Sequence, residues 1–392
     1  MKTNFKNFKG ILFNSSDLAS CIAPPYDVFE YGDDTDKMLR SNPSNIVHIQ
    51  KPLGTGDEKY KNAAEALKKY LDDKILLEDS KPGVYIIKQT WEGGSRTGFI
   101  ASVRLDDTLK RIKPHEHTKT APISDRFKLT AATNLNIGCI FSVFDDEKGI
   151  VRDILKNNSK EPRYSFKFPE DIDVKVYFSD DETILSSIED KTLYIADGHH
   201  RYKTMIKYRD MKRAEKAPGD AYEYTMMFLV PDNECTILPY HRAVNAGEAN
   251  IPSDFDEKLK KDFTITSSAK LAIPEKGTIG LLDKSGYRIL QPLKSDTRIE
   301  TAVLQEKVIA PHLNISIEDI KTSESITFIP GDISLETIQD KVDTGEYLLA
   351  FILPPPEFRH VSDAADAGEV MPPKSTYFYP KIPTGIVVRK CS

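Results

Sequence analysis

The sequence predicts an α+β (mixed α/β) protein whose sheets contain both parallel and antiparallel strands. An apolar run at 192–196 leads through Asp-Gly into a helical pattern, so a strand is followed at once by a helix. Two apolar segments at 83–89 and 98–105 flank Glu-Gly-Gly-Ser, which is typical of a β-hairpin. Neither G-x-G-x-x-G nor G-x-x-x-x-G-K-[ST] occurs, so neither a doubly wound dinucleotide fold nor a P-loop is expected.

The remaining elements of the first part of the chain follow from apolar spacing and turn residues. Apolar residues at helical spacing predict an amphipathic helix over 59–71. Residues 42–49 suggest a turn entering a strand, and 125–134 a short helix before an apolar strand at 137–144. Residues 201–216 read as a helix. The runs at 224–230 and 235–238 predict a second hairpin, which leads into His241 and Arg242.

After residue 247 the sequence changes in character, and we expect two regions. Residues 1–247 would form a catalytic core, and 248–392 a C-terminal α/β region that folds back to the site through 371–381. The second region shows helical patterns at 254–262, 300–309 and 335–342 and strand patterns at 277–282, 286–290, 325–329 and 347–353. Three prolines at 354–356 end the last strand, so the stretch up to Met371 is expected to be an exposed loop.

Composition and charge indicate an ordinary soluble protein of the cytoplasm. The 392 residues are 39% hydrophobic and 29% charged. The net charge of −6 gives no general attraction for nucleic acid. The four cysteines are scattered without paired metal spacing, and we see neither a signal peptide nor an apolar run of membrane-spanning length. We therefore expect no nucleic-acid partner and no membrane, and the oligomeric state is open.

The run Asp197-Gly198-His199-His200-Arg201 is the strongest indication of function. A strand that passes through glycine into a helix directs bare N–H groups and the positive end of the helix dipole at one spot. An acid, two imidazoles and a permanent cation gather there. This combination suits a phosphate group and the proton transfers around it.

Two further segments carry similar side chains. Five of the eight histidines lie in these three segments, namely His115 and His117, His199 and His200, and His241. One interpretation is a transition-metal site formed by the first four histidines with Glu116 or Asp197. The abundant arginine and lysine favour the other interpretation, a pocket for phosphoryl oxygens.

In the phosphoryl interpretation each residue type has a part. Asp197 or Glu116 would accept the proton of an attacking hydroxyl, and the other would hold Mg²⁺. Cations, imidazoles and hydroxyls would bind the phosphates: His115, His199, His200, Arg201, Arg126, Lys128, His241, Arg242, Lys374, Ser375 and Thr376, with the backbone of Gly198.

Seven ordered motifs give the chain a resemblance to a large prokaryotic family described only as a domain of unknown function. They are Ala23-Pro-Pro-Tyr-Asp-Val28, Asn42-Pro43 with Asn45-Ile46-Val47, His115-Glu116 with Thr118, Asp125-Arg126, Ala196-Asp-Gly-His-His-Arg-Tyr202, Leu238-Pro239 with His241-Arg242, and Lys374-Ser-Thr-Tyr-Phe378 with Pro380-Lys381. Ser44 departs from the pattern, since the family often has an aromatic residue there. The Asp-Gly-His-His-Arg run also resembles the phosphate-binding strand–turn–helix of the ParB/sulfiredoxin-like superfamily, which includes free-serine kinases.

This resemblance implies a Mg²⁺-dependent kinase that converts free L-serine to O-phospho-L-serine in serine or cysteine metabolism. The donor would be pyrophosphate, or a nucleotide such as ADP or ATP. Tyr26 and Asp27 would contact the amino acid, with Asp27 facing its ammonium group.

Two alternatives stay open at this point. A phosphohydrolase of a small metabolite would use the same pocket with water in place of the serine hydroxyl. A non-enzymatic nucleotide-binding regulator of ParB-like type would bind without turnover, although the acidic chain shows no basic tail or basic helix-turn-helix.

Overall fold

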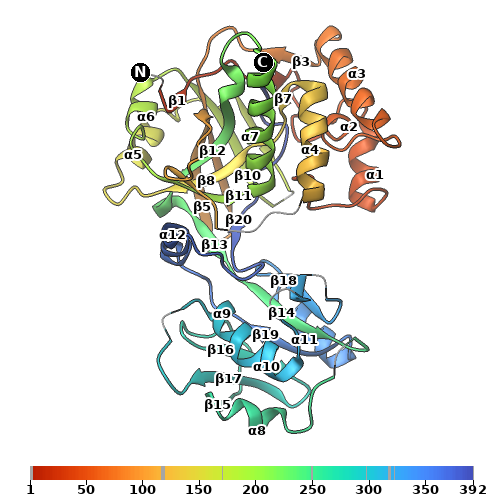
Figure 1. Ribbon diagram of the computed structural model, residues 1–392, viewed down its shortest axis with the longest axis vertical. Coiled ribbons are helices and arrows are strands. Elements are labelled where there is room, and N and C mark those ends of the chain that lie inside the picture. The colour runs from red at the N-terminus through yellow and green to blue at the C-terminus, as the bar shows by residue number, and fades with distance from the viewer. Residues whose placement is uncertain are drawn as a thin grey trace. The chain divides into compact units, whose positions relative to one another are not determined.

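The computed structural model describes residues 3–115, 120–169, 171–248, 250–296, 298–316, 319–321 and 323–391. These residues form two compact units, each with its own sheet (Figure 1). Unit 1 comprises Met1–Cys235 and Pro380–Ser392, and unit 2 comprises Thr236–Tyr379. The division therefore falls between Cys235 and Thr236 instead of at 247, because residues 236–247 pair with strands of unit 2. The chain returns to unit 1 at Pro380.

Unit 1 is built on a nine-stranded mixed sheet in the order β6-β11-β8-β12-β5-β4-β10-β9, with β1 also pairing with β5. Two neighbouring pairs, β11–β6 and β12–β8, are parallel, and the other pairs are antiparallel. The strands are β1 (Phe5–Lys6), β4 (Val84–Trp91), β5 (Gly94–Arg104), β6 (Ile112–Lys113), β8 (Ile140–Phe144), β9 (Tyr164–Lys167), β10 (Asp173–Ser179), β11 (Leu193–Asp197) and β12 (Tyr224–Pro231).

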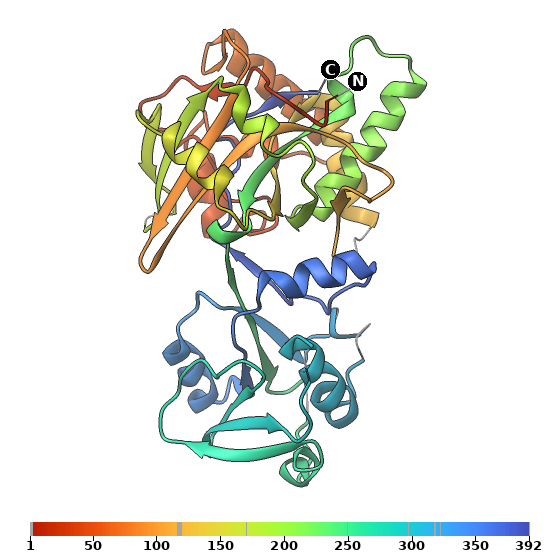
Figure 2. The same cartoon turned by 90° about the vertical axis from the view of Figure 1, so that its left-hand side faces the viewer.

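The predicted hairpin at 83–105 is the β4–β5 pair, seen as the long orange hairpin in Figure 2. Its central residues alternate between both faces of the sheet yet are almost all buried, so both faces are covered. Two short antiparallel pairs complete the strands of unit 1: β2 (Ile11–Phe13) with β3 (Leu76–Glu78), and β7 (Leu135–Asn136) with β21 (Arg389–Lys390).

The helices of unit 1 include two that carry the candidate site. These are α4 (Thr120–Thr133) and α7 (His199–Ala214), which pack side by side (Figure 1). Tyr202, Met205 and Tyr208 of α7 enter the same apolar core as strands β5, β8 and β11. The others are α1 (Asp34–Ser41), α2 (Val47–Gln50), α3 (Glu58–Asp72), α5 (Ile150–Asn157) and α6 (Glu182–Ser186).

Unit 2 contains a six-stranded antiparallel sheet in the order β15-β17-β16-β19-β14-β18. Its strands are β14 (Tyr240–Asn245), β15 (Phe263–Ser268), β16 (Ile279–Asp283), β17 (Gly286–Pro292), β18 (Ile326–Pro330) and β19 (Tyr347–Ile352). A separate pair joins β13 (Thr236–Leu238) to β20 (Tyr377–Tyr379). The helices are α8 (Phe255–Leu259), α9 (Glu300–Leu304), α10 (Ala310–Leu313), α11 (Leu335–Thr344) and α12 (Phe358–Ala367), with a π-helical turn at Gln305–Ile309.

The prediction of an α+β fold with mixed sheets is confirmed, while three local expectations are wrong. Residues 47–50 form a helical turn, not a strand. The run at 235–238 does not return along β12 as a hairpin, because β13 pairs with β20 in unit 2. The expected loop after the three prolines contains α12, whose Val361 and Ala365 form a buried face.

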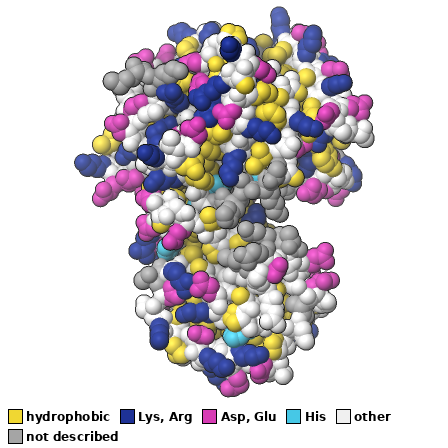
Figure 3. All heavy atoms as spheres, viewed as in Figure 1, with side chains coloured by type: hydrophobic (Ala, Val, Ile, Leu, Met, Phe, Trp, Pro, Cys, Tyr) yellow, Lys and Arg dark blue, Asp and Glu magenta, His cyan; other side chains and the backbone are white. Residues whose placement is uncertain are grey.

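The distribution of surface charge and the character of the helices can be compared with the composition. On the face drawn in Figure 3, Lys and Arg side chains lie among Asp and Glu side chains in both units. Among the helices that the structure describes, none has the length and apolar character needed to cross a membrane.

Candidate functional site

The turn between β11 and α7 has the form that the sequence predicts. Asp197 is the last residue of β11, and its Oδ1 accepts the N–H of Gly198 at 2.8 Å. Gly198 has φ 92° and precedes the first residue of the helix, His199. A Cβ atom at Gly198 would lie 2.8 Å from Nε of Arg201, so both the backbone and the space favour glycine. The helix starts two residues earlier than expected, which brings both histidines into its first turn.

Asp197 lies between two cations. Its Oδ2 is 3.4 Å from Nη2 of Arg201 and 3.4 Å from Nζ of Lys381. Burial disfavours the charged carboxylate, but Lys381 and Arg201 outweigh this effect and hold the pKa of Asp197 well below its usual range. The carboxylate is therefore ionised at neutral pH.

Arg201 is oriented by both the turn and a neighbouring strand. Besides Asp197, its guanidinium donates to the carbonyl of Cys139, next to β8. The spacing of four residues between Asp197 and Arg201 places them on the same side of the first turn of α7. The sequence predicts an acid and a cation at this turn, but it predicts neither their ion pair nor the contact with Cys139.

His115 and His199 form a buried pair of imidazoles. Their rings meet edge to face at 4.8 Å, and the main-chain N–H of His115 donates to Nε2 of His199 at 3.4 Å. Burial lowers the pKa of His115 to about 4 and that of His199 well below its ordinary value, so both rings are neutral. His199 thus supports the turn as a hydrogen-bond acceptor. His200, the second residue of α7, is half-buried.

The second candidate base falls outside the described residues. Glu116, together with His117, lies in the gap between 115 and 120, so its predicted role stays a prediction. Across the part of the chain that is described, no three His, Cys, Asp or Glu side chains gather in a way that would hold a metal ion. The histidine metal site consequently gains no support.

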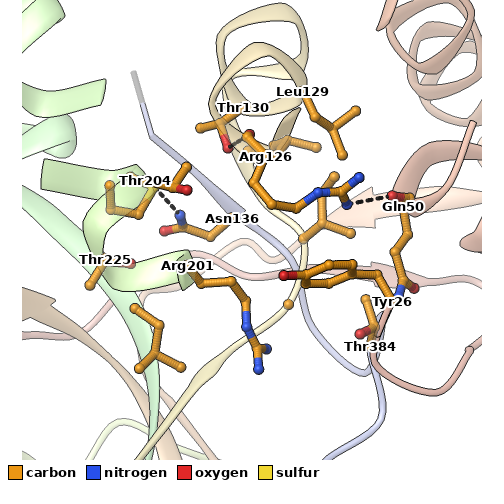
Figure 4. Close-up of a pocket in the computed structure, with 15 residues that line it drawn as sticks. Tyr26, Gln50, Arg126, Leu129, Thr130, Asn136, Arg201, Thr204, Thr225 and Thr384 are labelled. Atoms are coloured by element: carbon orange, nitrogen blue, oxygen red, sulfur yellow. Dashed lines mark hydrogen bonds between the residues drawn. The ribbon is translucent and has the colours of Figure 1, made fainter. Parts of the chain in front are cut away.

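A small cavity lies beside this turn and is lined by two arginines (Figure 4). Its volume is about 60 Å³, which is room for a few water molecules. Arg126 of α4 donates to the carbonyl of Gln50 at 2.7 Å, and its guanidinium stacks 4.5 Å from the centre of the Tyr26 ring. The polar and small residues of the lining are Tyr26, Gln50, Arg126, Thr130, Asn136, Gly138, Arg201, Thr204, Thr225 and Thr384.

Arg126 is itself held by a carboxylate on its own helix. Its Nε lies 2.9 Å from Oδ2 of Asp125, whose Oδ1 accepts from Lys59 at 2.6 Å and from Tyr60 at 2.8 Å. Although burial opposes ionisation of Asp125, Arg126 and Lys59 lower its pKa to about 2. This network fixes Arg126 against the cavity and joins α4 to α3.

Lys128 and Asp27, which the sequence analysis assigns to the site, do not line the cavity. The ammonium of Lys128 is 2.7 Å from Asp57 at the exposed surface, and Lys128 does not line the cavity. Asp27 is exposed, and its Oδ2 is 3.8 Å from Nζ of Lys381. Tyr26 lines the cavity, and its contact with the amino acid stays a prediction.

The remaining predicted residues belong to unit 2, where they come together around β14. Arg242 is buried and donates to the carbonyls of Tyr240 at 2.7 Å, Pro373 at 2.9 Å and Lys374 at 2.8 Å. Burial lowers its pKa to about 9. These contacts fasten the turn at 372–376 to β14.

The neighbours of Arg242 have structural contacts too. Nδ1 of His241 accepts the N–H of Leu353 at 3.0 Å, and burial lowers the pKa of His241 to about 4. The hydroxyl of Ser375 donates to the carbonyl of Pro372 at 2.7 Å, and Thr376 is buried. Lys374 is exposed, has φ 52°, and its ammonium lies 5.2 Å from the ring centre of Tyr240.

Sequence reasoning missed Lys381 as a site residue. It lies 184 positions from Asp197, so no local pattern joins the two residues. The one available signal was the pair Pro380-Lys381 within the last of the seven family motifs.

A model of the family described as "Protein of unknown function (DUF1015)" matches residues 5–314. The sequence matches no curated protein. Among solved structures, a mutant free serine kinase in complex with AMP is 13% identical, with 74% of this chain and 92% of that chain covered and a TM-score of 0.37. A conserved hypothetical protein from Pyrococcus furiosus is 16% identical, with 74% and 95% covered and a TM-score of 0.37. A C-terminally truncated SbnI from Staphylococcus aureus is 11% identical, with 74% and 87% covered and a TM-score of 0.38.

Proposed function

We propose that this chain, which belongs to the DUF1015 family, is a cytoplasmic kinase that phosphorylates free L-serine to O-phospho-L-serine. The observation that carries the proposal is the ionised carboxylate of Asp197, set between Arg201 and Lys381 at the N-terminus of a 16-residue helix. The carboxylate can accept a hydrogen bond from the serine hydroxyl, and the two cations and the helix N-terminus can bind phosphoryl oxygens. The Asp-Gly-His-His-Arg resemblance supplies the choice of serine.

The binding of the donor would depend on fixed positive charge. The first N–H groups of α7 have no partners within the helix, and the helix dipole adds to the charges of Arg201 and Lys381. Arg126, held by Asp125 and Gln50, would extend this positive surface into the cavity. Phosphoryl transfer needs positioning and charge neutralisation above all, and these groups supply both.

In the proposed reaction the serine hydroxyl attacks the terminal phosphorus of the donor. The new bond joins serine Oγ to phosphorus, the bridging P–O bond breaks, and orthophosphate leaves when pyrophosphate is the donor. The hydroxyl proton would pass late in the step to the carboxylate of Asp197 or Glu116, since the transition state is largely dissociative, and from there to the departing orthophosphate. Asp197, being a weak base, would orient the hydroxyl more than it would pull off the proton. Glu116 is the alternative base.

Mg²⁺ would be held by Asp197 and Glu116 together with donor oxygens. Mg²⁺ commonly uses one or two carboxylates plus phosphate oxygens in place of a full protein cage. The ionised carboxylate of Asp197 suits that arrangement. When bound, the ion would neutralise charge that develops on the phosphoryl oxygens.

The donor is proposed to be pyrophosphate, with ADP or ATP as the alternative. Arg201, Lys381 and Arg126 lie at or beside the turn, and the sequence contains neither of the two standard nucleotide-binding glycine motifs. Pyrophosphate consists wholly of phosphoryl groups, so cations and helix N–H groups would be enough to bind it.

Phosphorus NMR of the full chain with L-serine and Mg²⁺ tests the proposal, with pyrophosphate, ADP and ATP in separate tubes. Phosphoserine in one tube would support the kinase and identify its donor. Orthophosphate without phosphoserine would favour a phosphohydrolase, and tight nucleotide binding without turnover would favour a regulator. Either result would overturn the proposal.

The variant Asp197→Asn separates the two tasks of the site. Because the amide keeps the shape but loses the charge, we expect turnover to fall by at least 100-fold, a loss of about 3 kcal/mol in transition-state stabilisation. Donor binding should be retained. Unchanged turnover would remove Asp197 from the reaction.

A further inference from the structure

The geometry points to Lys381 as a phosphate-binding residue of the site, supplied by the segment that re-enters unit 1 after unit 2. No motif spacing assigns it this role. The inference rests on the proposed function in that the anion it would bind is the donor. It is argued from the contacts of the side chain and from the way its backbone is held.

The ammonium of Lys381 lies between two carboxylates without closing on either one. Its Nζ is 3.4 Å from Oδ2 of Asp197 and 3.8 Å from Oδ2 of Asp27. A close pair between an ammonium and a carboxylate has a separation of about 2.7–2.9 Å. About a fifth of the side chain (22%) is exposed, so it reaches solvent. A phosphoryl oxygen at this ammonium would compete with these two ion pairs, each longer than a close contact.

The backbone on both sides of Lys381 is anchored in the core of unit 1. The carbonyl of Pro380 accepts from Nη2 of Arg96 at 2.6 Å, and the carbonyl of Lys381 accepts from Nε2 of Gln89 at 3.4 Å. Arg96 is fully buried between the rings of Phe141 and Phe228, at 4.6 and 5.2 Å from their centres. The lysine thus has a fixed base.

Farther along, the same segment is paired with the N-terminal part of unit 1. Thr384 and Ala23 exchange two main-chain hydrogen bonds of 2.8 and 3.1 Å. Lys381 is consequently held from both sides, while the end of its side chain remains long and adjustable. A rigid backbone with an adjustable cation is the arrangement expected of a binding residue.

The charges at the turn support this role. Asp27 and Asp197 contribute two negative charges, which Lys381 and Arg201 balance. If pyrophosphate binds the ammonium of Lys381, the carboxylate of Asp197 becomes available to the serine hydroxyl. The carboxylate of Asp27 then becomes available to the ammonium group of serine. Asp27 already has an ammonium 3.8 Å away in this structure.

Calorimetric titration of the full chain with inorganic pyrophosphate tests the inference, using wild type, Lys381→Gln and Lys381→Arg. Loss of one charge-assisted contact should weaken binding by about 10- to 100-fold in Lys381→Gln. The arginine variant keeps the charge and should bind more tightly than the glutamine variant. Lys390→Gln is the matched control, because Lys390 lies in the same segment and pairs with Glu78 at the surface.

A merely structural role would lower the unfolding temperature and leave pyrophosphate binding in the folded protein intact. Equal affinity in wild type and Lys381→Gln would overturn the inference. Pyrophosphate binding that depends on Lys381, without any phosphoserine, would uphold the inference and remove the kinase proposal. Phosphoserine formation with an unchanged donor KM in Lys381→Gln would uphold the kinase proposal and overturn the inference about Lys381. If wild type binds no pyrophosphate, the inference is wrong.

Discussion

Replacing Asp125 by asparagine should destabilise unit 1 in a way that depends on pH. Asp125 lies on α4 and receives hydrogen bonds from Lys59 and Tyr60 of α3 and from Arg126. It is the centre of a network that joins two helices and fixes the arginine of the cavity. Asparagine has nearly the same shape but lacks the charge, so the change isolates the electrostatic part.

The size of the effect follows from the pKa of Asp125. The pKa is about 2 in the folded protein against an ordinary 3.8, and this difference corresponds to roughly 2.5 kcal/mol of stability at neutral pH. Because the folded pKa is depressed, this contribution is fully present above pH 3.8 and is lost as the pH falls towards 2. By pH 3 about half of it should remain.

Urea unfolding followed by the fluorescence of Trp91 measures this contribution. Trp91 is the single tryptophan of the chain and belongs to β4, so its signal reports on unit 1. The matched control is Asp57→Asn, since Asp57 bridges α3 and α4 through Lys128, but at the exposed surface. The control should lose no more than about 0.5 kcal/mol. A loss in Asp125→Asn that is the same at pH 7 and pH 3, or no larger than that of the control, would refute the reasoning.

Two further predictions concern the turn at Gly198 and the arginine of unit 2. Gly198→Ala places a side chain at φ 92° and 2.8 Å from Nε of Arg201, so unit 1 should lose about 1–3 kcal/mol in the Trp91 assay; an unchanged midpoint would contradict the strain argument. Arg242→Met leaves the partly buried carbonyls of Pro373 and Lys374 without their donor, at a cost of about 1–3 kcal/mol. Hydrogen exchange should then quicken in β14 and at 372–376, and unchanged protection there would show that Arg242 does not hold this turn.

The elements that the sequence predicts correctly are those stabilised by local patterns. The helix α3 shows apolar residues at helical spacing over its 15 residues, and the β4–β5 hairpin has glycines at its turn. The turn at Gly198 is equally local, since strand, glycine and helix follow one another. The gathering of Asp197 and Arg201 at this turn is likewise a local feature, although their ion pair was not predicted.

The wrong expectations involve short or distant interactions. Helix α2 is a single turn, too short to show periodicity, and the Asn45 side chain accepts the N–H of Val47 at its start. Strand β13 finds its partner β20 about 140 positions away, so its neighbours in sequence could not reveal the pairing. In α12, three preceding prolines suggested a loop, yet the helix follows them with a capping box between Glu357 and His360.

In the candidate site, too, local features are predicted from the sequence, and contacts between distant segments are not. Arg126 and Tyr26 both line the cavity, and their mutual stacking depends on how two distant segments pack. Lys128 lies between Arg126 and Leu129, which line the cavity, but it faces another side of α4, and only the position of α3 determines that it pairs with Asp57. Arg242 donates to three carbonyls because it is buried, and the sequence does not show this burial. Its role as a ligand for phosphate stays a prediction.

The return of the chain to unit 1 at Pro380 affects the order of events during synthesis. Val388 pairs with Ile11 and β21 pairs with β7, so unit 1 is completed by residues that follow all of unit 2. At about 5–20 residues per second, a ribosome needs roughly 10–30 s to translate the intervening residues 236–379. During that interval the edges at Ile11 and Ala23 would wait without their partners, and the Asp197 turn would lack its lysine. The nascent chain therefore completes the contacts between Lys381 and the Asp197 turn, and with them the proposed anion site, only after unit 2 has emerged.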